Sequence, residues 1–410
     1  MSKYKIITKC QISSSKKLET IINLGFLPPV NEMFEINNRN FKQNFFNTEL
    51  LYCAKSKLAQ INTVVDKEIL FPKSYPYTSS TTKNLRDNFQ DLKKDIDKIL
   101  HSIDKKFIID IGSNDGNLLK NFKYDYKVLG ITPERIGRLA IKKGIPTLLR
   151  YFDNETSNLI LKKYKKANVI TATNVFAHID NPKKVLKNIS KILDKDGIFV
   201  SESHYFISLI KTLQYDTIYH EHLRYYSLSS LKFLFNQIGF KIFDVKKINT
   251  HGGSLRVFAS KNKKYKVSKK VKNFLSFEKK FLTKKTFFTF KRNVVQSKLD
   301  LHKIISDLKK RGNKIFGVSA PSRATTLINY VGIDENIIDC ILEIKGSKKI
   351  GKYIPGTKIP IKSEDIILKE KPDFLLILSW HIYKEIIKNL KKKGFNGKFI
   401  IPLPKPIIIK

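Results

Sequence analysis

The densest group of titratable side chains in the sequence lies in residues 215–226, YDTIYHEHLRYY, which hold two of the eight histidines. On a helix Tyr219 and His222 would share a face, whereas in an extended segment His220 and His222 would do so. A metal site would need a third ligand, and the sequence offers no clear candidate for it. A general base needs only one neutral imidazole and a group that orients it, so the segment favours proton transfer over a polar surface loop.

A second candidate site lies in residues 107–119, FIIDIGSNDGNLL. An apolar strand pattern runs into a turn with two glycines and then into the start of a helix, which is how α/β sheets bind nucleotides. The glycine spacing fits neither a dinucleotide site nor a P-loop. Asp110 at the strand end suits a cationic, phosphate-poor ligand, and S-adenosylmethionine (SAM) has that character. An ordinary strand-to-helix turn without a ligand is the alternative.

Alternating strand and helix patterns predict the elements that position these groups. Residues 86–265 are expected to form a mostly parallel, doubly wound sheet, and residues 311–410 a second α/β unit. A helical connector is expected over 266–310. Residues 1–85 read as a small irregular unit with a turn at 24–29.

The N-terminal unit contains two C-x-x-S segments, which begin at Cys10 and Cys53. Paired C-x-x-C turns form structural zinc sites, but Ser13 and Ser56 occupy the places of the second cysteines, and serine is a poor zinc ligand. We therefore predict no metal and treat zinc as doubtful. Two unrelated buried cysteines are the alternative.

Charge and composition narrow the class of partner. The chain of 410 residues has 78 Lys and Arg against 36 Asp and Glu, a formal net charge of +42. These basic residues are spread along the chain, which favours solvated lysine faces over a nucleic-acid site, although the charge would attract anionic substrates. Because no apolar run reaches transmembrane length and no signal peptide is evident, we predict a cytoplasmic protein without a membrane partner. The oligomeric state is not predicted.

Together these motifs resemble the sugar C-methyltransferases that act on nucleotide-linked 4-keto-deoxy sugars. The likeness spans nearly the whole chain and includes Y-P-Y-T-S-S at 75–80, the glycine turn, N-V-F-A-H at 174–178, Y-H-E-H at 219–222, H-G-G-S-L-R-V at 251–257, Y-I-P-G-T at 353–357 and a late Trp-His. It implies a class I SAM-dependent methyltransferase domain with a Rossmann-like fold. That domain is flanked by a small N-terminal domain of the zinc-binding type and by a second, C-terminal Rossmann-like α/β domain.

The resemblance also implies roles for single residues. His222 would be the base that removes a hydrogen next to the ketone, Tyr219 and His178 would donate to the enolate oxygen, and Glu221 would orient an imidazole or a sugar hydroxyl. The residues expected to bind SAM are Asp110, Gly112, Asn114, Gly116, Thr132 and Asn174. The residues expected to bind the nucleotide-diphosphate sugar are Tyr75, Tyr77, His220, Arg256, Ser319 and Arg323.

Two departures from the family pattern affect these expectations. Thr132 stands where an acid usually bonds both ribose hydroxyls, and Glu134 is a possible substitute. Arg323 stands where a lysine is common. The alternatives to a sugar methyltransferase are an RNA or protein methyltransferase, suggested by the charge, and a catalytically degenerate binding protein, suggested by the lost cysteines.

Overall fold

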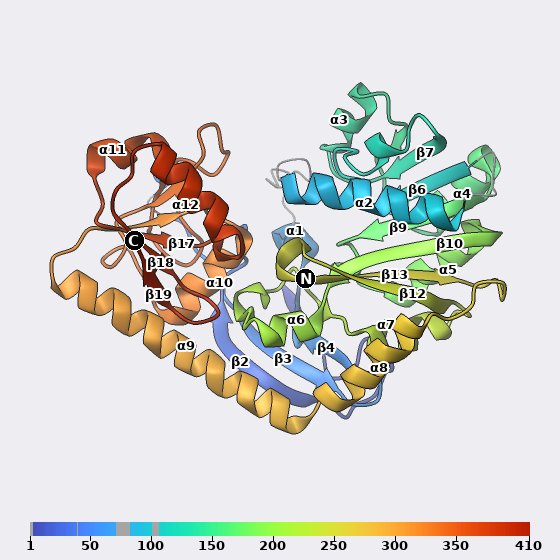
Figure 1. The fold of residues 1–410 in the computed structure, drawn as a ribbon, viewed down its shortest axis with the longest axis horizontal. Coiled ribbons are helices and arrows are strands. Elements are labelled where there is room, and N and C mark those ends of the chain that lie inside the picture. Colours follow the sequence, from blue (N-terminus) through green and yellow to red (C-terminus); the bar gives the residue numbers. More distant parts are fainter. Residues whose placement is uncertain (1–2, 39, 71–82, 101–105) are drawn as a thin grey trace.

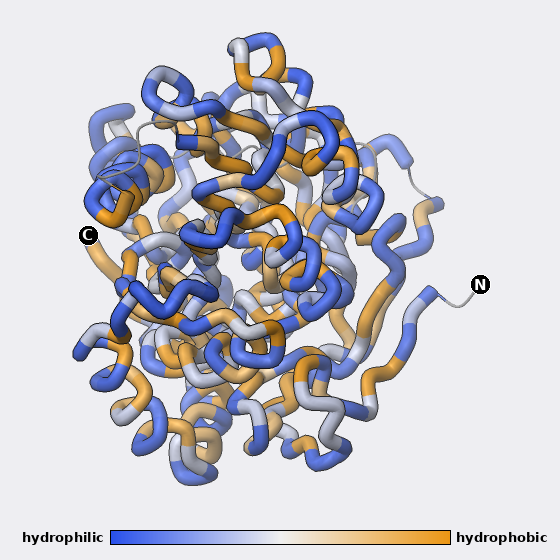
Figure 2. Tube along the Cα trace, turned by 90° about the vertical axis from the view of Figure 1, so that its right-hand side faces the viewer, coloured by the Kyte–Doolittle hydropathy of each residue, from blue (hydrophilic) through white to orange (hydrophobic). Residues whose placement is uncertain are grey.

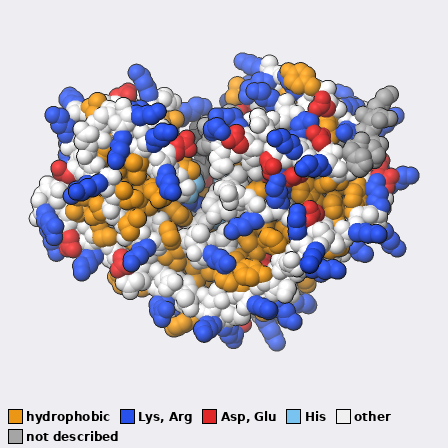
Figure 3. Space-filling view, viewed as in Figure 1, with side chains coloured by type: hydrophobic (Ala, Val, Ile, Leu, Met, Phe, Trp, Pro, Cys, Tyr) orange, Lys and Arg blue, Asp and Glu red, His pale blue; other side chains and the backbone are white. Residues whose placement is uncertain are grey.

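The computed structural model describes residues 3–38, 40–70, 83–100 and 106–410. Figure 1 shows two lobes joined below by strands of the N-terminal region and by the long helix α9 (Lys284–Lys310). Within these described residues no helix is both long and apolar enough to cross a membrane. In Figure 2 the hydrophilic residues dominate the outer turns, and Figure 3 shows lysine and arginine scattered over the visible face rather than gathered into one patch.

The larger lobe is built on a seven-stranded sheet of order β12-β13-β10-β9-β6-β7-β8. Its strands are β6 (Lys106–Ile111), β7 (Tyr126–Ile131), β8 (Thr147–Leu148), β9 (Ala167–Thr173), β10 (Leu193–His204), β12 (Lys241–Ile248) and β13 (Ser254–Ser260). All neighbouring pairs are parallel except those made by β13. The predicted doubly wound sheet is therefore confirmed, and the strand order reverses between β6 and β9, where such sheets bind ligands.

Helices accompany this sheet, as the alternating strand and helix patterns predicted. They are α2 (Lys83–Ile99), α3 (Gly137–Lys142), α4 (Asn154–Tyr164), α5 (Pro182–Ile192), α6 (Phe206–Lys211) and α7 (Leu228–Asn236). One expected helix is shorter than predicted. The segment after the glycine turn forms only a single 3₁₀ turn, η2 (Leu119–Asn121).

The N-terminal unit is more regular than the sequence suggested. It forms a four-stranded sheet of order β11-β4-β3-β2, with β2 (Glu19–Leu27), β3 (Phe46–Cys53), β4 (Leu58–Ile61) and β11 (Arg224–Tyr225). The turn predicted at 24–29 is wrong because β2 continues through Leu27. Gly25, with a φ of 85°, lies in a bulge between the pairs made by Asn23 and Phe26, so the glycine bends the strand without ending it. A further pair, β1 (Tyr4–Ile6) with β5 (Thr63–Val65), completes the unit.

The smaller lobe holds a six-stranded sheet of order β16-β15-β14-β17-β18-β19, which is parallel apart from β19. Its strands are β14 (Ile315–Val318), β15 (Ile341–Glu343), β16 (Ile361–Ser363), β17 (Phe374–Ile377), β18 (Lys398–Ile401) and β19 (Ile407–Ile409). Helices α10 (Ser322–Val331), α11 (Ile367–Glu370) and α12 (Tyr383–Lys392) accompany them. Helices α8 (Lys269–Phe281) and α9 link this lobe to the larger one, as the predicted helical connector.

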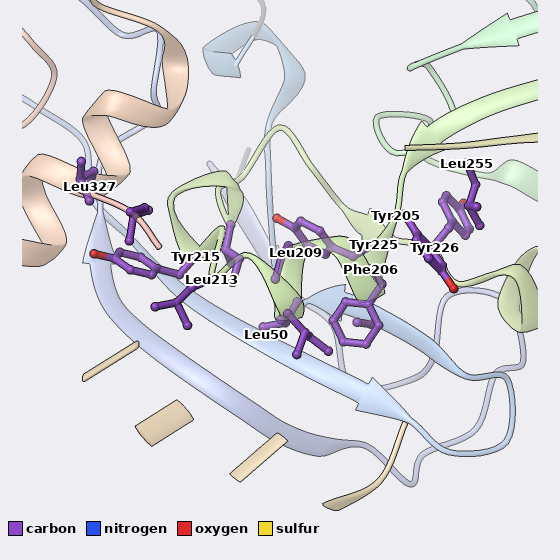
Figure 4. Packing of buried hydrophobic residues seen from close by; sticks show 14 of the residues in the cluster. Leu50, Tyr205, Phe206, Leu209, Leu213, Tyr215, Tyr225, Tyr226, Leu255 and Leu327 are labelled. Atoms are coloured by element: carbon purple, nitrogen blue, oxygen red, sulfur yellow. The ribbon is translucent and has the colours of Figure 1, made fainter. Parts of the chain in front are cut away.

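One hydrophobic core runs through the three larger sheets. Leu50 of β3, Tyr215 between the lobes and Leu327 of α10 belong to the same buried cluster. Figure 4 shows side chains from residues 205–226 standing over the N-terminal strands, with Leu327 at one end. Close packing of these buried side chains holds the elements that meet there in fixed relative positions.

Candidate active site

The Y-H-E-H segment forms a tight turn rather than a helix or a strand. The amide of His222 donates to the carbonyl of Tyr219 over 3.0 Å, which closes the turn. The two rings stack with centroids 4.2 Å apart, so Tyr219 and His222 lie on the same side. His220 points away from them, since its ring contacts Thr48, Asn47 and Phe46 of the N-terminal unit. This arrangement gives His220 a packing role in place of the predicted contact with substrate.

The His222 imidazole is oriented and neutral. Its Nδ1 lies 2.9 Å from the carbonyl of Thr217, which can only accept a hydrogen bond, so Nδ1 carries the hydrogen and Nε2 has the lone pair. Burial, together with the nearby His178, holds the pKa of His222 well below 6.5. The ring is therefore a neutral acceptor at physiological pH, which is the state that a general base needs.

His178 lies beside this base and is fixed by the same turn. Its ring centroid is 5.1 Å from that of His222, and its Nδ1 donates to the backbone carbonyl of Glu221 over 2.7 Å. Arg224, fully buried, donates to the carbonyls of Phe176, Ile179 and Asp180. The guanidinium thus holds the loop that carries His178, a positioning role that the sequence did not suggest.

All three units meet at Glu221. Its carboxylate accepts from Nδ2 of Asn31 over 2.6 Å, and Oδ1 of Asn31 accepts from the hydroxyl of Ser322 over 3.3 Å. Lys349, near enough to Glu221 for an electrostatic interaction, donates to the carbonyl of Ala320 over 2.5 Å. Burial lowers the pKa of Lys349. Neither Asn31 nor Lys349 was expected, because each comes from a segment whose sequence reads as an ordinary loop.

Arg323 joins the smaller lobe to residues 214–216, which precede the Y-H-E-H turn. It is 7% exposed, with NH2 3.2 Å from Oε1 of Gln214, NH1 3.3 Å from Nδ1 of His381 and Nε 3.7 Å from Asp216. Asp216 also accepts from the indole of Trp380 over 2.7 Å. These partners favour a domain-joining role for Arg323 over the predicted binding of an anion.

Ser319 follows β14 with a φ of 67° and precedes α10, which packs against residues 215–217 at this junction. Tyr75 and Tyr77, predicted to contact substrate, lie outside the described residues. Of the residues predicted to bind the substrate, Ser319 therefore stays a candidate.

Arg256 does not reach the junction. Its side chain is 0% exposed, and its Nε lies 2.6 Å from Oε1 of Glu202 on the neighbouring strand. The other nitrogens contact Asn88, Asp91 and Asp95 of α2. This network ties α2 to the sheet, so we assign Arg256 a structural role in place of the predicted one in substrate binding.

The glycine turn lies at the switch point of the large sheet, where a nucleotide ligand is expected. Gly112 has a φ of 77°, and a Cβ built on it would lie 2.4 Å from Val175, so the turn approaches the loop after β9 as closely as glycine allows. Asn174 in that loop has a φ of 56°, and its backbone N–H donates to the backbone carbonyl of Glu202. Residues 174–178 thus connect the glycine turn with His178.

Asp110 lies beneath the turn and not in it. It is 2% exposed and accepts from the hydroxyl of Thr171 over 2.6 Å. Burial raises the pKa of Asp110 to about 7, and the charge of Glu202 adds to the effect. Asp110 therefore supports the strand end, and a second carboxylate lies closer to the turn.

That carboxylate belongs to Glu134 after β7. Thr132 is 1% exposed and donates to Glu134 over 3.3 Å, and Asn114 of the glycine turn also hydrogen-bonds the carboxylate. Burial raises the pKa of Glu134 despite these donors. Thr132 thus does not replace the missing acid; it holds one that stands two residues later.

The N-terminal unit offers a mixed donor set where a structural zinc site would have four thiolates. Cys10 and Cys53 are buried free thiols that contact serine hydroxyls. Among the described residues, no group of three or more His, Cys, Asp and Glu side chains could hold a metal ion. Two thiols and two hydroxyls do not fit structural zinc, so no step is assigned to a metal.

Comparison with known families agrees with this geometry. Residues 10–71 match the family "Putative zinc binding domain", residues 85–245 "Methyltransferase domain", and residues 249–404 "C-methyltransferase C-terminal domain". A curated relative, "C-methyltransferase NovU" of Streptomyces niveus, is 28% identical over 98% of this chain and 97% of its own. The chain is a SAM-dependent C-methyltransferase. The resemblance read from the motifs of this methyltransferase is thereby confirmed, as is its class I Rossmann-like fold.

Solved methyltransferases resemble part of the C-methyltransferase. One from Clostridium acetobutylicum is 14% identical, covers 44% of this chain and 93% of its own, and has a TM-score of 0.34. Another from Thermotoga maritima, described as a possible histamine N-methyltransferase, is 18% identical, covers 43% and 92%, and has a TM-score of 0.33.

The residues around the glycine turn fit SAM. Gly112 is half-buried and packs against Val175, so only glycine fits this turn, and the carboxylate of Glu134 follows the end of β7, where an acid suits a ribose diol. The phosphate-binding spacings are absent from the turn, as a phosphate-free nucleoside requires. Asn114 and Glu134 are thus the polar groups of this C-methyltransferase that would hold the donor.

Replacing Glu134 by Gln is expected to weaken SAM binding about tenfold or more, because a hydrogen bond to a charged group contributes about 1.5–3 kcal/mol. Isothermal titration calorimetry of the folded protein measures the affinity. Glu155→Gln, at an exposed glutamate of α4, is the matched control. An unchanged affinity in Glu134→Gln would remove Glu134 from the donor site.

Proposed function

We propose that this protein transfers the methyl group of SAM to the carbon next to the ketone of a nucleotide-linked 4-keto-deoxy sugar. The observation that carries the proposal is the neutral imidazole of His222, oriented by Thr217, beside a loop that also touches the glycine turn. Methylation of a carbon requires removal of a C–H proton, and an oriented, neutral imidazole next to the donor site can accept it. The choice of carbon over oxygen rests on the likeness to the C-methyltransferase relative.

The chain's own residues supply the proton transfer. The ketone acidifies the neighbouring C–H, and Nε2 of His222 accepts that proton, which leaves an enolate. Burial and the charge of Glu221 hold the pKa of Tyr219 well above 10, so its phenol keeps its hydrogen and can donate to the enolate oxygen. SAM supplies the electrophilic methyl group that the enolate carbon receives.

His178 is the weaker of the two candidate donors. Its Nδ1 hydrogen is already directed at the carbonyl of Glu221, so Nε2 of the neutral ring has no hydrogen to donate. Burial and the charge of Arg224 lower the pKa of His178, which disfavours the doubly protonated ring. We therefore propose Tyr219 as the principal enolate donor, with His178 positioning the base and the sugar.

The nucleotide would lie toward the smaller lobe. Lys349 and Ser319 are the candidate partners of a diphosphate, since Arg323 is engaged by residues of the domain boundary. Glu221, which bonds Asn31, is the candidate partner of a sugar hydroxyl. The excess of basic residues would raise the local concentration of such an anionic substrate.

Mass spectrometry of purified protein with SAM and a panel of nucleotide-linked sugars tests the proposal. We expect one added methyl on a 4-keto sugar, with fragmentation that places it on a ring carbon, and no product from the matched 4-hydroxy sugar. Deuterium from solvent should enter the ketosugar without SAM, because the base acts before methyl transfer.

A methyl group on oxygen would contradict the proposed reaction. Methylation of added RNA or protein, with every ketosugar left unlabelled by deuterium, would support the alternative that the charge suggested.

A further inference from the structure

The two C-x-x-S turns of the N-terminal unit have the same backbone form. The amide of Ser14 donates to the carbonyl of Cys10, and that of Lys57 donates to the carbonyl of Cys53, both over 2.8 Å. Ser14 has a φ of 57° and Lys57 a φ of 56°. Two turns of the same shape, each begun by a cysteine, therefore face one another.

The side chains of these turns pair crosswise. Sγ of Cys10 lies 3.2 Å from Oγ of Ser56, and Oγ of Ser13 lies 3.4 Å from Sγ of Cys53. Cys10, Cys53 and Ser56 are at most 2% exposed. The four side chains thus converge on one buried point, at the positions where four thiolates would surround a zinc ion.

The paired turns also contact the residues that follow the Y-H-E-H turn. Lys57, which closes the second turn, accepts from Ser227 through its carbonyl over 3.0 Å. The backbone N–H of Gln11, in the first turn, donates to the side-chain oxygen of Gln60 over 2.9 Å. The backbone N–H of Ile61, on the same strand as Gln60, donates to the carbonyl of Leu223, next to His222, over 3.2 Å. Whatever holds the two turns together therefore also holds the strand that follows the catalytic turn.

We propose that the crossed thiol–hydroxyl pairs have replaced the metal in this chain: the N-terminal unit folds without zinc, yet its backbone keeps a cradle that two Ser→Cys changes would turn back into a zinc site. The serine hydroxyls keep hydrogen-bonding partners for the buried thiols, as buried polar groups require. Serine and cysteine carry their oxygen or sulfur atom at the same place on the side chain, so Ser→Cys changes at 13 and 56 would direct four sulfur atoms at the same point.

Metal content and thermal stability of three proteins test this inference, and neither readout depends on the proposed reaction. Wild type purified with zinc present should hold far less than one zinc per chain, and its melting temperature should not change with a chelator. The variant S13C/S56C should hold close to one zinc per chain and should melt at a lower temperature when the chelator is added. S306C/S347C, which adds two thiols to the smaller lobe and its connector, should behave as wild type does.

Cobalt(II) provides a second readout if S13C/S56C purifies poorly. The variant refolded with cobalt should show the thiolate-to-metal absorption of a tetrahedral four-sulfur site, and wild type should not. Stoichiometric zinc in wild type, or its unfolding by the chelator, would overturn the claim that the unit folds without metal. No gain of zinc or cobalt by S13C/S56C would overturn the claim that the cradle persists.

Discussion

Replacing His222 by Asn is expected to lower turnover by about 10²–10⁴-fold, the usual contribution of a general base. The asparagine amide can still donate to the carbonyl of Thr217, so the turn should keep its shape while the proton acceptor is lost. SAM affinity should stay at the wild-type value, because the donor residues are untouched. Steady-state rates and calorimetric titration of SAM measure the two quantities separately.

The control is His302→Asn, at an exposed histidine of α9, which should leave the rate unchanged. A His222→Asn protein with a near-normal rate would refute the assignment of the base. Solvent deuterium exchange into the ketosugar should disappear in the same variant, which separates loss of the base from loss of methyl transfer.

The pH dependence of the rate gives the same assignment an independent check. Because burial and His178 hold the pKa of His222 well below 6.5, the neutral form already dominates at pH 6.5. The rate should therefore be flat from pH 6.5 toward neutrality and should fall only at lower pH, where the ring takes up a proton. An acid limb centred at or above pH 6.5 would mean that another group is the base.

Replacing Arg256 by Met is expected to lower the free energy of unfolding by about 3–5 kcal/mol, because removing one partner leaves a buried charge uncompensated. The charge that remains is Glu202, whose side chain is 0% exposed. Urea unfolding followed by circular dichroism measures the loss.

Lys246→Met is the matched control, since Lys246 contacts the same Asp91 and Asp95 but is 38% exposed. Surface pairs of that kind contribute at most about 1 kcal/mol. The double variant Arg256→Met with Glu202→Gln should recover part of the stability, because no unpaired carboxylate is left. Equal losses in Arg256→Met and Lys246→Met would contradict the structural role of Arg256.

Local sequence patterns were enough to predict most of the fold of this chain. The β-branched run before Gly112 and the amphipathic helix patterns predicted the large sheet and its switch point. They could do so because the alternation of buried and exposed positions in a strand or helix is visible in neighbouring residues. The same is true of the Y-H-E-H turn, in which Tyr219 and His222 are close in sequence and in space. The turn predicted around Gly25 is wrong because a glycine in a bulge and a glycine in a turn look alike in sequence.

Contacts between residues far apart in the chain could not be predicted from the sequence. Arg256 reads as an anion-binding residue until its burial against Glu202 is known. Asn31 bonds Glu221 and Lys349 lies within electrostatic range of it, each from a distant part of the chain, and no local pattern marks either one. Glu134 was named from the sequence as a substitute for the acid missing at Thr132, and its contacts with Thr132 and Asn114, which the sequence did not show, support that role.

The pairing of β11 with β4 sets an order of events during synthesis on the ribosome. Residues 10–61 emerge first, but the edge of β4 stays without its neighbour until the chain has been made as far as Tyr225. An uncovered strand edge is a template for pairing with other chains, and proteins fold N-terminal parts first as they emerge. We therefore expect the nascent N-terminal unit to be a chaperone client until the catalytic turn and its strand arrive to cover it.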